Sequence, residues 1–292
     1  MTGASARPRL TSHFVQHKDL TTAYYDEGSG PVLLLLHGFT GGKLDFHDQL
    51  GWFTDRYRVL VPDQRGHGES TNSGVAEVYR LTELADDLHS FIETLHASRG
   101  GLQSLHLLGH SMGGMVAMRY ALDHPARLLS LLLMDTASAP LDLPGSGAGA
   151  TTNPLLQLGA KGLVDMMKAM PVSPEVQHGI DFLGKTEHWA RIQEKLEQMD
   201  PVAFMALRRE LGQAAAVTQR LAAITCPTTV LVGAADKVFI QPSKAMAAVI
   251  PGASLAVIAA AAHCPQYENA SAWRASIDAH LNARLNAHLA PL

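Results

Sequence analysis

Short apolar runs alternate with longer amphipathic stretches along most of the chain. The segment Val32–Leu36 is continuously apolar, which is typical of a strand buried on both faces of a parallel sheet. Similar runs predict further strands at 58–61, 105–108, Leu128–Met134, 228–232 and 255–258. Between them, residues 81–96 repeat apolar side chains at helical spacing. This alternation predicts an α/β fold with a mostly parallel, doubly wound sheet.

The beginning of the chain has a different pattern. A polar turn at 17–19 separates two short strand-like segments, 12–16 and 21–25. Two such segments joined by a short turn predict an antiparallel hairpin.

One long stretch, from 137 to 213, contains helical patterns and no strand-like run. It begins with a connector rich in Gly, Ala and Pro at 140–150. We therefore predict an α/β core in two parts, 1–136 and 214–292, with a helical lid at 137–213 between them. An insertion between two strands would lie at the carboxyl edge of the sheet, where open α/β sheets bind ligands. We expect at least half of its large apolar side chains to form a small core of their own: Met166, Met167, Met170, Phe182, Trp189 and Phe204.

The composition narrows the class of protein. The chain has 292 residues, of which 47% are hydrophobic and 17% charged, so an ordinary folded domain is expected rather than a disordered chain. The net charge of -4 and the lack of a Lys/Arg block argue against a nucleic-acid partner. No apolar run is long enough to span a bilayer or to form a signal peptide. We therefore expect a cytoplasmic protein, in which the two cysteines form neither a disulfide nor a metal site.

Residues 109–113 read Gly-His-Ser-Met-Gly, between the predicted strand at 105–108 and a helical stretch at Met112–Asp123. In this strand–turn–helix context the G-x-S-x-G pattern predicts a sharp turn that exposes the hydroxyl of Ser111. The glycines are needed because neighbouring elements approach closely there. The alternative is a serine that only caps the helix.

A serine nucleophile requires a general base and an acid that orients it. Asp236 follows the strand at 228–232 in a Gly-Ala-Ala-Asp turn, and His263 follows the strand at 255–258. Taken singly, they are more typical of a turn residue and a helix cap. The order Ser, Asp, His, each after a strand, predicts Ser111, His263 and Asp236 as the catalytic residues. Asp135, at the end of the strand Leu128–Met134, is the alternative acid.

Two backbone N–H groups are candidates for an oxyanion hole. The amide of Met112 lies at the start of the predicted helix, and the amide of Phe39 lies in the loop after the first buried strand. The alternative for the second is a glycine-rich loop without a catalytic task.

The motifs HGF at 37–39, DQRGHGES at 63–70 and GHSMGG at 109–114 resemble those of the α/β-hydrolase superfamily. They are similar to the branch with carboxylesterases, enol-lactonases, C–C bond hydrolases and cofactor-free haloperoxidases. In this resemblance the 63–70 loop is largely structural. Ser111 departs from epoxide hydrolases and haloalkane dehalogenases, in which an aspartate would be required, and Ala262 replaces the glycine often found before the histidine.

These residues and the resemblance predict a serine hydrolase that cleaves a small, mostly apolar carboxylic ester or lactone through an acyl-enzyme. No metal or organic cofactor is expected, and the partner is a small-molecule substrate of a monomer or homodimer. Two alternatives remain: a C–C bond hydrolase of a diketone-like ring-cleavage product, and a small-molecule receptor that retains a hydrolase pocket.

Overall fold

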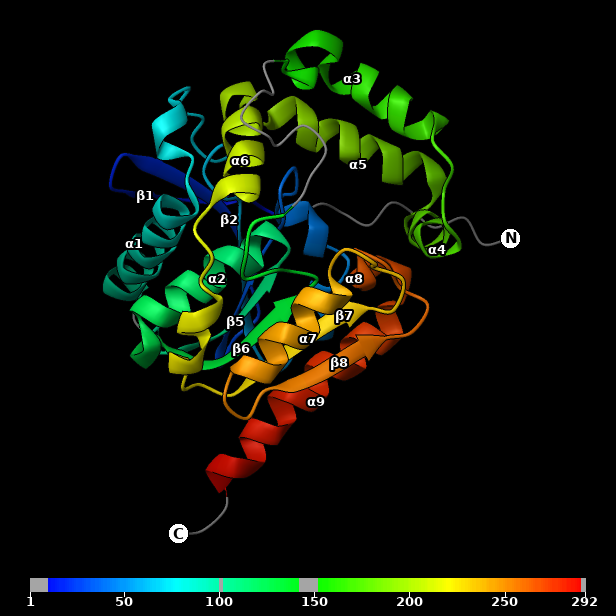
Figure 1. Cartoon of the computed structure of the whole chain (residues 1–292). Coiled ribbons are helices and arrows are strands. Elements are labelled where there is room, and N and C mark those ends of the chain that lie inside the picture. Colours follow the sequence, from blue (N-terminus) through cyan, green and yellow to red (C-terminus); the bar gives the residue numbers. More distant parts are fainter. Residues whose placement is uncertain (1–9, 100–101, 142–151, 290–292) are drawn as a thin grey trace.

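An eight-stranded sheet forms the centre of the molecule (Figure 1), with the strand order β1-β2-β4-β3-β5-β6-β7-β8. The computed structural model describes residues 10–99, 102–141 and 152–289, so most of the predicted connector at 140–150 lies outside the described residues. The strands are β1 (His13–His17), β2 (Leu20–Glu27), β3 (Val32–Leu36), β4 (Arg58–Pro62), β5 (Leu105–His110), β6 (Leu128–Met134), β7 (Thr228–Gly233) and β8 (Ser254–Ile258).

The strands from β3 to β8 pair in parallel, whereas β2 pairs antiparallel with β1 and with β4. The predicted hairpin is therefore confirmed, with a register from His13 opposite Tyr24 to His17 opposite Leu20. The mostly parallel sheet predicted from the alternating pattern is also confirmed.

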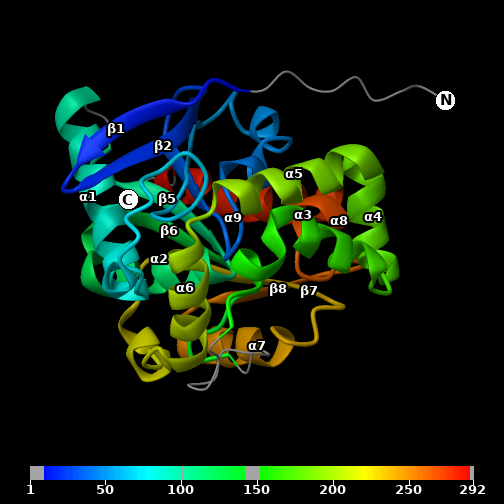
Figure 2. The same ribbon diagram turned by 90° about the horizontal axis from the view of Figure 1, so that it is seen from above.

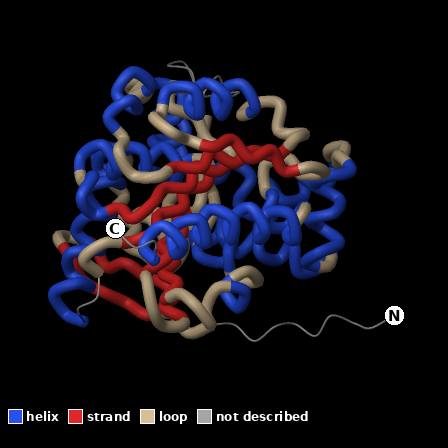
Figure 3. The backbone as a smooth tube through the Cα atoms, turned by 90° about the horizontal axis from the view of Figure 1, so that it is seen from below, coloured by secondary structure: helices blue, strands red, loops and turns tan. Residues whose placement is uncertain are grey.

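Helices cover both faces of the sheet (Figures 2 and 3). Outside the segment between β6 and β7 they are α1 (Leu81–Arg99), α2 (Met112–Asp123), α7 (Ile240–Val249), α8 (Pro265–Glu268) and α9 (Ala270–Leu289). Short 3-10 turns lie in the connecting segments: η1 (Lys43–Phe46), η2 (Leu50–Trp52), η3 (Ala76–Val78), η4 (Pro125–Arg127) and η5 (Thr218–Ala223).

Strand β3 shows why the apolar runs are continuous. Its alternate side chains point to opposite faces, so Leu34 joins a core cluster with α1 and α2, while Leu33 joins a second cluster with α9. All five of its residues are at most 1% exposed. Burying each leucine contributes about 1.5–3 kcal/mol, so a polar residue at any of these positions would oppose folding.

In the part of the chain between β6 and β7 that the structure describes, four α-helices follow one another: α3 (Pro154–Ala169), α4 (Pro174–Leu183), α5 (Lys185–Gln198) and α6 (Pro201–Gln213). Three of them begin with a capping residue followed by proline. The side chains of Asn153, Ser173 and Asp200 accept hydrogen bonds from backbone amides of the first turn, and proline fits the first helical position because its missing N–H has no intrahelical partner there.

The apolar side chains of this segment are less buried than the sequence suggested. Phe204 is buried and Trp189 packs partly buried against the main core. The expectation of a separate small core is therefore wrong, because these two side chains belong to the main core and the other four are 38–59% exposed: Met166, Met167, Met170 and Phe182.

The 63–70 loop is held by the buried carboxylate of Asp63. It accepts hydrogen bonds from the backbone amides of Lys43 (2.7 Å) and Glu69 (3.0 Å), and it forms an ion pair with the Lys43 ammonium group. A Cβ at Gly68, where φ is +53°, would lie 2.2 Å from Asp63 Oδ2. Glycine at position 68 is therefore required by the positive φ and by the close approach of the Asp63 carboxylate.

None of the helices in the described ranges combines the length and the hydropathy that a membrane crossing requires.

Candidate active site

Ser111 lies at the sharp turn between β5 and α2. Its backbone has φ 53° and ψ -118°, a strained conformation for a residue with a side chain. If Gly109 had a Cβ, that atom would lie 2.4 Å from the carbonyl oxygen of Gly113. A Cβ on Gly113 would lie 2.6 Å from the carbonyl oxygens of Leu36 and His37. Glycine is therefore required on both sides, because β5, α2 and the end of β3 meet by their backbones.

The structure brings Ser111, His263 and Asp236 together. Ser111 Oγ lies 3.1 Å from His263 Nε2, and His263 Nδ1 lies 2.7 Å from Asp236 Oδ2. A carboxylate only accepts hydrogen bonds, so Nδ1 carries the imidazole proton and Nε2 is left as the acceptor for the serine hydroxyl. The Asp236 side chain is 7% exposed and that of His263 41%, so the imidazole is partly accessible to solvent while its carboxylate partner is buried.

The loops that carry Asp236 and His263 are in backbone contact. The amides of Ala234 and Ala235 donate to the carbonyls of Ile258 and Ala261, at 2.9 and 2.8 Å. Asp236 then donates its own amide to Gly233 O, which closes the turn that the Gly-Ala-Ala-Asp sequence indicated. The left-handed backbone in the second loop is at Ala260, with φ 49°, so alanine at 262 needs no unusual conformation.

Three groups around His263 were not identified from the sequence. The ring of Phe239 stacks on the imidazole, with centroids 4.9 Å apart. His110 Nε2 donates to the His263 carbonyl at 2.8 Å, and Glu268 accepts the amides of Ala262 and Cys264. His110 had one available signal, its place inside the G-H-S-M-G motif, whereas the other two depend on contacts that no local pattern contains.

Two buried histidines near the site are uncharged. Burial lowers the pKa of His110 to about 3 and that of His37 to about 4. Both are therefore neutral near pH 7, and His263 has no cationic imidazole beside it.

One candidate amide donor, Met112, follows Ser111 in the chain, and the other, Phe39, follows Gly38, which packs against Ser111. Met112 is the first residue of α2, where an N–H group has no carbonyl partner within the helix. Phe39 is in a turn closed by the Gly41 amide on Gly38 O, which does not use the Phe39 N–H. A Cβ at Gly38 would lie 3.0 Å from Ser111 Cβ, so this loop contacts the serine directly.

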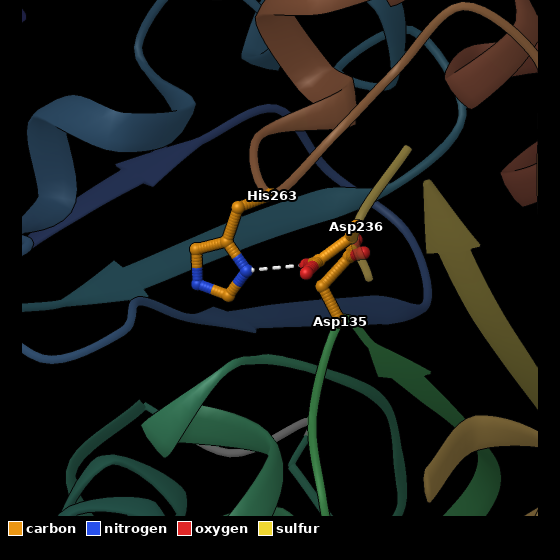
Figure 4. Close-up of side chains that lie close together, drawn as sticks. All are labelled: Asp135, Asp236 and His263. Atoms are coloured by element: carbon orange, nitrogen blue, oxygen red, sulfur yellow. Dashed lines mark hydrogen bonds and ion pairs between the residues drawn. The ribbon is translucent and has the colours of Figure 1, made fainter. Parts of the chain in front are cut away.

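The alternative acid, Asp135, also reaches this place, but His263 bonds to Asp236. Asp135 is fully buried, and its Oδ1 accepts the Gly233 amide at 2.8 Å. Figure 4 shows its carboxyl group beside that of Asp236. Polar atoms of Asp135, Asp236 and His263 all lie within 4.8 Å of one another. Burial, and next the negative charge of Asp236, raises the pKa of Asp135 well above its ordinary value.

Comparison with known proteins agrees with this architecture. Residues 31–270 match the family model described as the alpha/beta hydrolase fold. Lipase 3 of Moraxella sp. (strain TA144) is 35% identical over 134 residues, which are 45% of this chain and 41% of that lipase. The chain thus spans about two fifths of that relative.

Two other relatives match over most of their length. The 2-hydroxy-6-oxo-6-phenylhexa-2,4-dienoate hydrolase of Burkholderia cepacia is 28% identical over 85% of this chain and 86% of that enzyme. The solved structure of a thermophilic esterase from Thermogutta terrifontis superposes with a TM-score of 0.78 and 26% identity, over 94% of this chain and 99% of that one.

Proposed function

Because this chain belongs to the α/β hydrolase family, we propose that it is a serine hydrolase that cleaves a small, mostly apolar carboxylic ester or lactone. The observation that carries the proposal is the continuous contact from Asp236 Oδ2 through the His263 ring to Ser111 Oγ, with distances of 2.7 and 3.1 Å. These are hydrogen-bond distances for a nucleophile, a base and an orienting acid.

In the proposed first step, Ser111 Oγ attacks the carbonyl carbon while His263 Nε2 takes the hydroxyl proton. Asp236 holds the tautomer that leaves Nε2 free to accept, and its negative charge stabilises the imidazolium that forms. His263 then gives the proton to the leaving alkoxide, and the acyl group remains as an ester on Ser111. A water molecule activated by the same Nε2 releases the acid and restores the serine.

The negative charge on the carbonyl oxygen during both steps is assigned to the amides of Phe39 and Met112. Each donor of this kind typically accounts for about 10²- to 10³-fold in rate. The start of α2 adds the positive end of the helix dipole at the same position. No cofactor takes part in this chemistry.

We further propose that the four helices from 137 to 213 act as a lid that shapes the substrate pocket. The Phe204 ring of α6 packs against Phe39, with centroids 5.3 Å apart, so this segment contacts the loop assigned to the oxyanion. The apolar character of both rings favours an apolar substrate.

Labelling with a fluorophosphonate probe tests the nucleophile. We expect the probe to modify Ser111 and to leave Ser111→Ala unmodified, with circular dichroism confirming that the variant is folded. The same variant should lose rapid multiple turnover of p-nitrophenyl acetate. A folded wild-type protein that neither reacts with the probe nor turns over any ester or lactone would overturn the proposal, and saturable ligand binding without turnover would favour a receptor.

A C–C bond hydrolase is the second candidate, favoured by the match to the Burkholderia cepacia enzyme over 86% of its length. The same residues serve either reaction, so only a comparison of substrates can distinguish ester hydrolysis from C–C bond cleavage. Turnover of a vinylogous diketone, with none of p-nitrophenyl esters or lactones, would select this alternative.

A further inference from the structure

The site contains a second buried carboxyl group that the proposed mechanism does not use. Asp135 follows the last residue of β6, with its backbone at φ 43°, and its residue is 0% exposed. Because β6 and β7 are neighbours in the sheet, this position lies beside the loop that carries Asp236. Water has no access to the Asp135 side chain.

The hydrogen bonds of Asp135 do not fit a carboxylate. Oδ1 accepts the Gly233 amide, but Oδ2 is buried and has no donor among the described residues. A carboxylate oxygen buried without a donor is costly, whereas a carboxylic acid carries one O–H donor of its own. The acceptor within reach is Asp236, whose carboxyl oxygen lies in the same 4.8 Å cluster.

Asp236 in turn has room for another donor. Within the described parts of the chain, its carboxylate receives one hydrogen bond, from His263 Nδ1. A carboxylate fixed at one oxygen can still turn about its side-chain bonds, and a second donor from Asp135 would hold it against the imidazole.

We propose that Asp135 is a positioning residue that, as a neutral carboxylic acid, donates a hydrogen bond from Oδ2 to Asp236. It thereby fixes the carboxylate that orients His263, a role that rests on the proposed function. The negative charge behind the imidazole is then that of Asp236 alone.

The charges facing Asp135 agree with a neutral acid. They come from Asp236 after β7, His263 and the Cys264 thiol after β8, and Glu268 on α8. Two of these are carboxyl groups, and burial keeps the Cys264 thiol neutral by raising its pKa well above the ordinary value. Two carboxyl groups that share one site cannot both ionise easily, and the more buried of the pair retains the proton.

Equilibrium unfolding tests the proton without reference to catalysis. If Asp135 is protonated when folded, the wild-type native state holds one proton more than the unfolded state at every pH between the unfolded value of 3.8 and the raised folded value. Wild-type stability then falls as pH rises through this window. Asparagine has the same shape and cannot ionise.

We therefore compare urea unfolding of wild type and Asp135→Asn at several pH values from 5 to 8. The ratio of their unfolding equilibrium constants should shift tenfold per pH unit in favour of the variant, up to the folded pKa of Asp135. The control is Asp55→Asn, whose side chain is 74% exposed, and its ratio to wild type should stay constant. A constant ratio for Asp135→Asn as well would overturn the proposal.

Kinetics test the positioning role. We expect Asp135→Ala to lower kcat at least tenfold with little change in KM, and Asp135→Asn, which keeps an N–H donor for Asp236, to recover most of that loss. In Asp135→Asn the acid limb of the kcat/KM profile, the range in which activity falls as the pH is lowered, should lie at the same pH as in wild type. If Asp135 were ionised, its removal would destabilise the imidazolium and move the limb to lower pH, which would contradict the proposal.

These outcomes separate the two proposals. If Ser111 fails to react with the probe, the proposed function fails, and the unfolding measurement still decides whether Asp135 holds a proton. If Ser111 reacts and the unfolding ratio is constant, only the role of Asp135 fails.

Discussion

Gly233 illustrates how single residues determine the geometry of this site. It is the last residue of β7, and an added Cβ would lie 2.0 Å from the Ala262 carbonyl and 2.6 Å from the Ala261 carbonyl. Both obstacles are backbone atoms, which cannot rotate away as a flexible side chain can. The contact therefore sets the distance between the loop of Asp236 and the loop of His263.

We expect Gly233→Ala to lower kcat/KM by about 10²-fold, because a displacement of about 1 Å at a catalytic group costs that much. The variant should also lose roughly 1–3 kcal/mol of unfolding free energy, as overpacked sites do. Urea unfolding and ester turnover provide the two measurements. The matched control is Gly51→Ala, where a Cβ would meet nothing within 4 Å. Equal effects of the two substitutions would contradict this account.

At the scale of elements, the sequence predicted β3 to β7 well because each is an apolar run that is almost wholly buried. The apolar run of β8 also predicted a strand, although its side chains Leu255 and Val257 are exposed. It also placed Ser111, Asp236 and His263 after strand ends, where a parallel sheet brings loops to one edge. It could not predict that Asp135 and Asp236 lie side by side, because they are 101 positions apart in the sequence and only the pairing of β6 with β7 makes them neighbours. Likewise, helical periodicity predicted amphipathic helices between 137 and 213, but it could not predict which element packs against each apolar face. The exposure of Met166 and Met170 was therefore not predicted.

Helix α5 is attached to the segment after β3 by buried ion pairs. Lys195 pairs with Asp45, and Arg191 pairs with Asp48. Burial opposes ionisation of Asp45, but Lys195 outweighs it and lowers the pKa of that carboxyl below its ordinary value. Asp45 also accepts the Gly42 amide at 3.1 Å, so this pair links the proposed lid to the loop that contains Phe39.

We expect Lys195→Met to reduce the unfolding free energy at pH 7 by about 3–5 kcal/mol, because it leaves a buried carboxylate without its cation. A carboxyl with a depressed folded pKa contributes stability above its unfolded pKa and loses it as pH falls through the folded value. Without Lys195, burial raises the folded pKa of Asp45, so the variant takes up a proton first and the difference from wild type should shrink as the pH falls toward the depressed wild-type value, as urea unfolding across pH can measure. Lys161→Met, which breaks the exposed pair with Asp165 on α3, should have no measurable effect. A loss that does not vary with pH would count against the role of Asp45.

At the scale of the whole molecule, one sheet edge gathers chemistry from distant parts of the chain. Ser111 follows β5, Asp236 follows β7 and His263 follows β8, and parallel pairing from β5 to β8 places these strand ends in a row. The helices cover the two faces of the sheet, and loops form this edge. The arrangement needs only the polypeptide for the proposed acyl transfer.

Because the proposed mechanism uses only groups of the protein, it leads to a prediction about metal ions. Oxygen and nitrogen atoms of Asp135, Asp236 and His263 lie within 4.8 Å of one another, a spacing that a divalent cation would also tolerate. A cation on His263 Nδ1 would displace the proton from that nitrogen, and a neutral imidazole would then carry its proton on Nε2, where it cannot accept the Ser111 proton. The proposed mechanism thus requires protons, not a metal ion, in this cluster. We expect dialysis against EDTA to leave kcat for ester hydrolysis unchanged; activity that disappears on chelation and returns with a divalent ion would contradict the assignment of His263 as the general base.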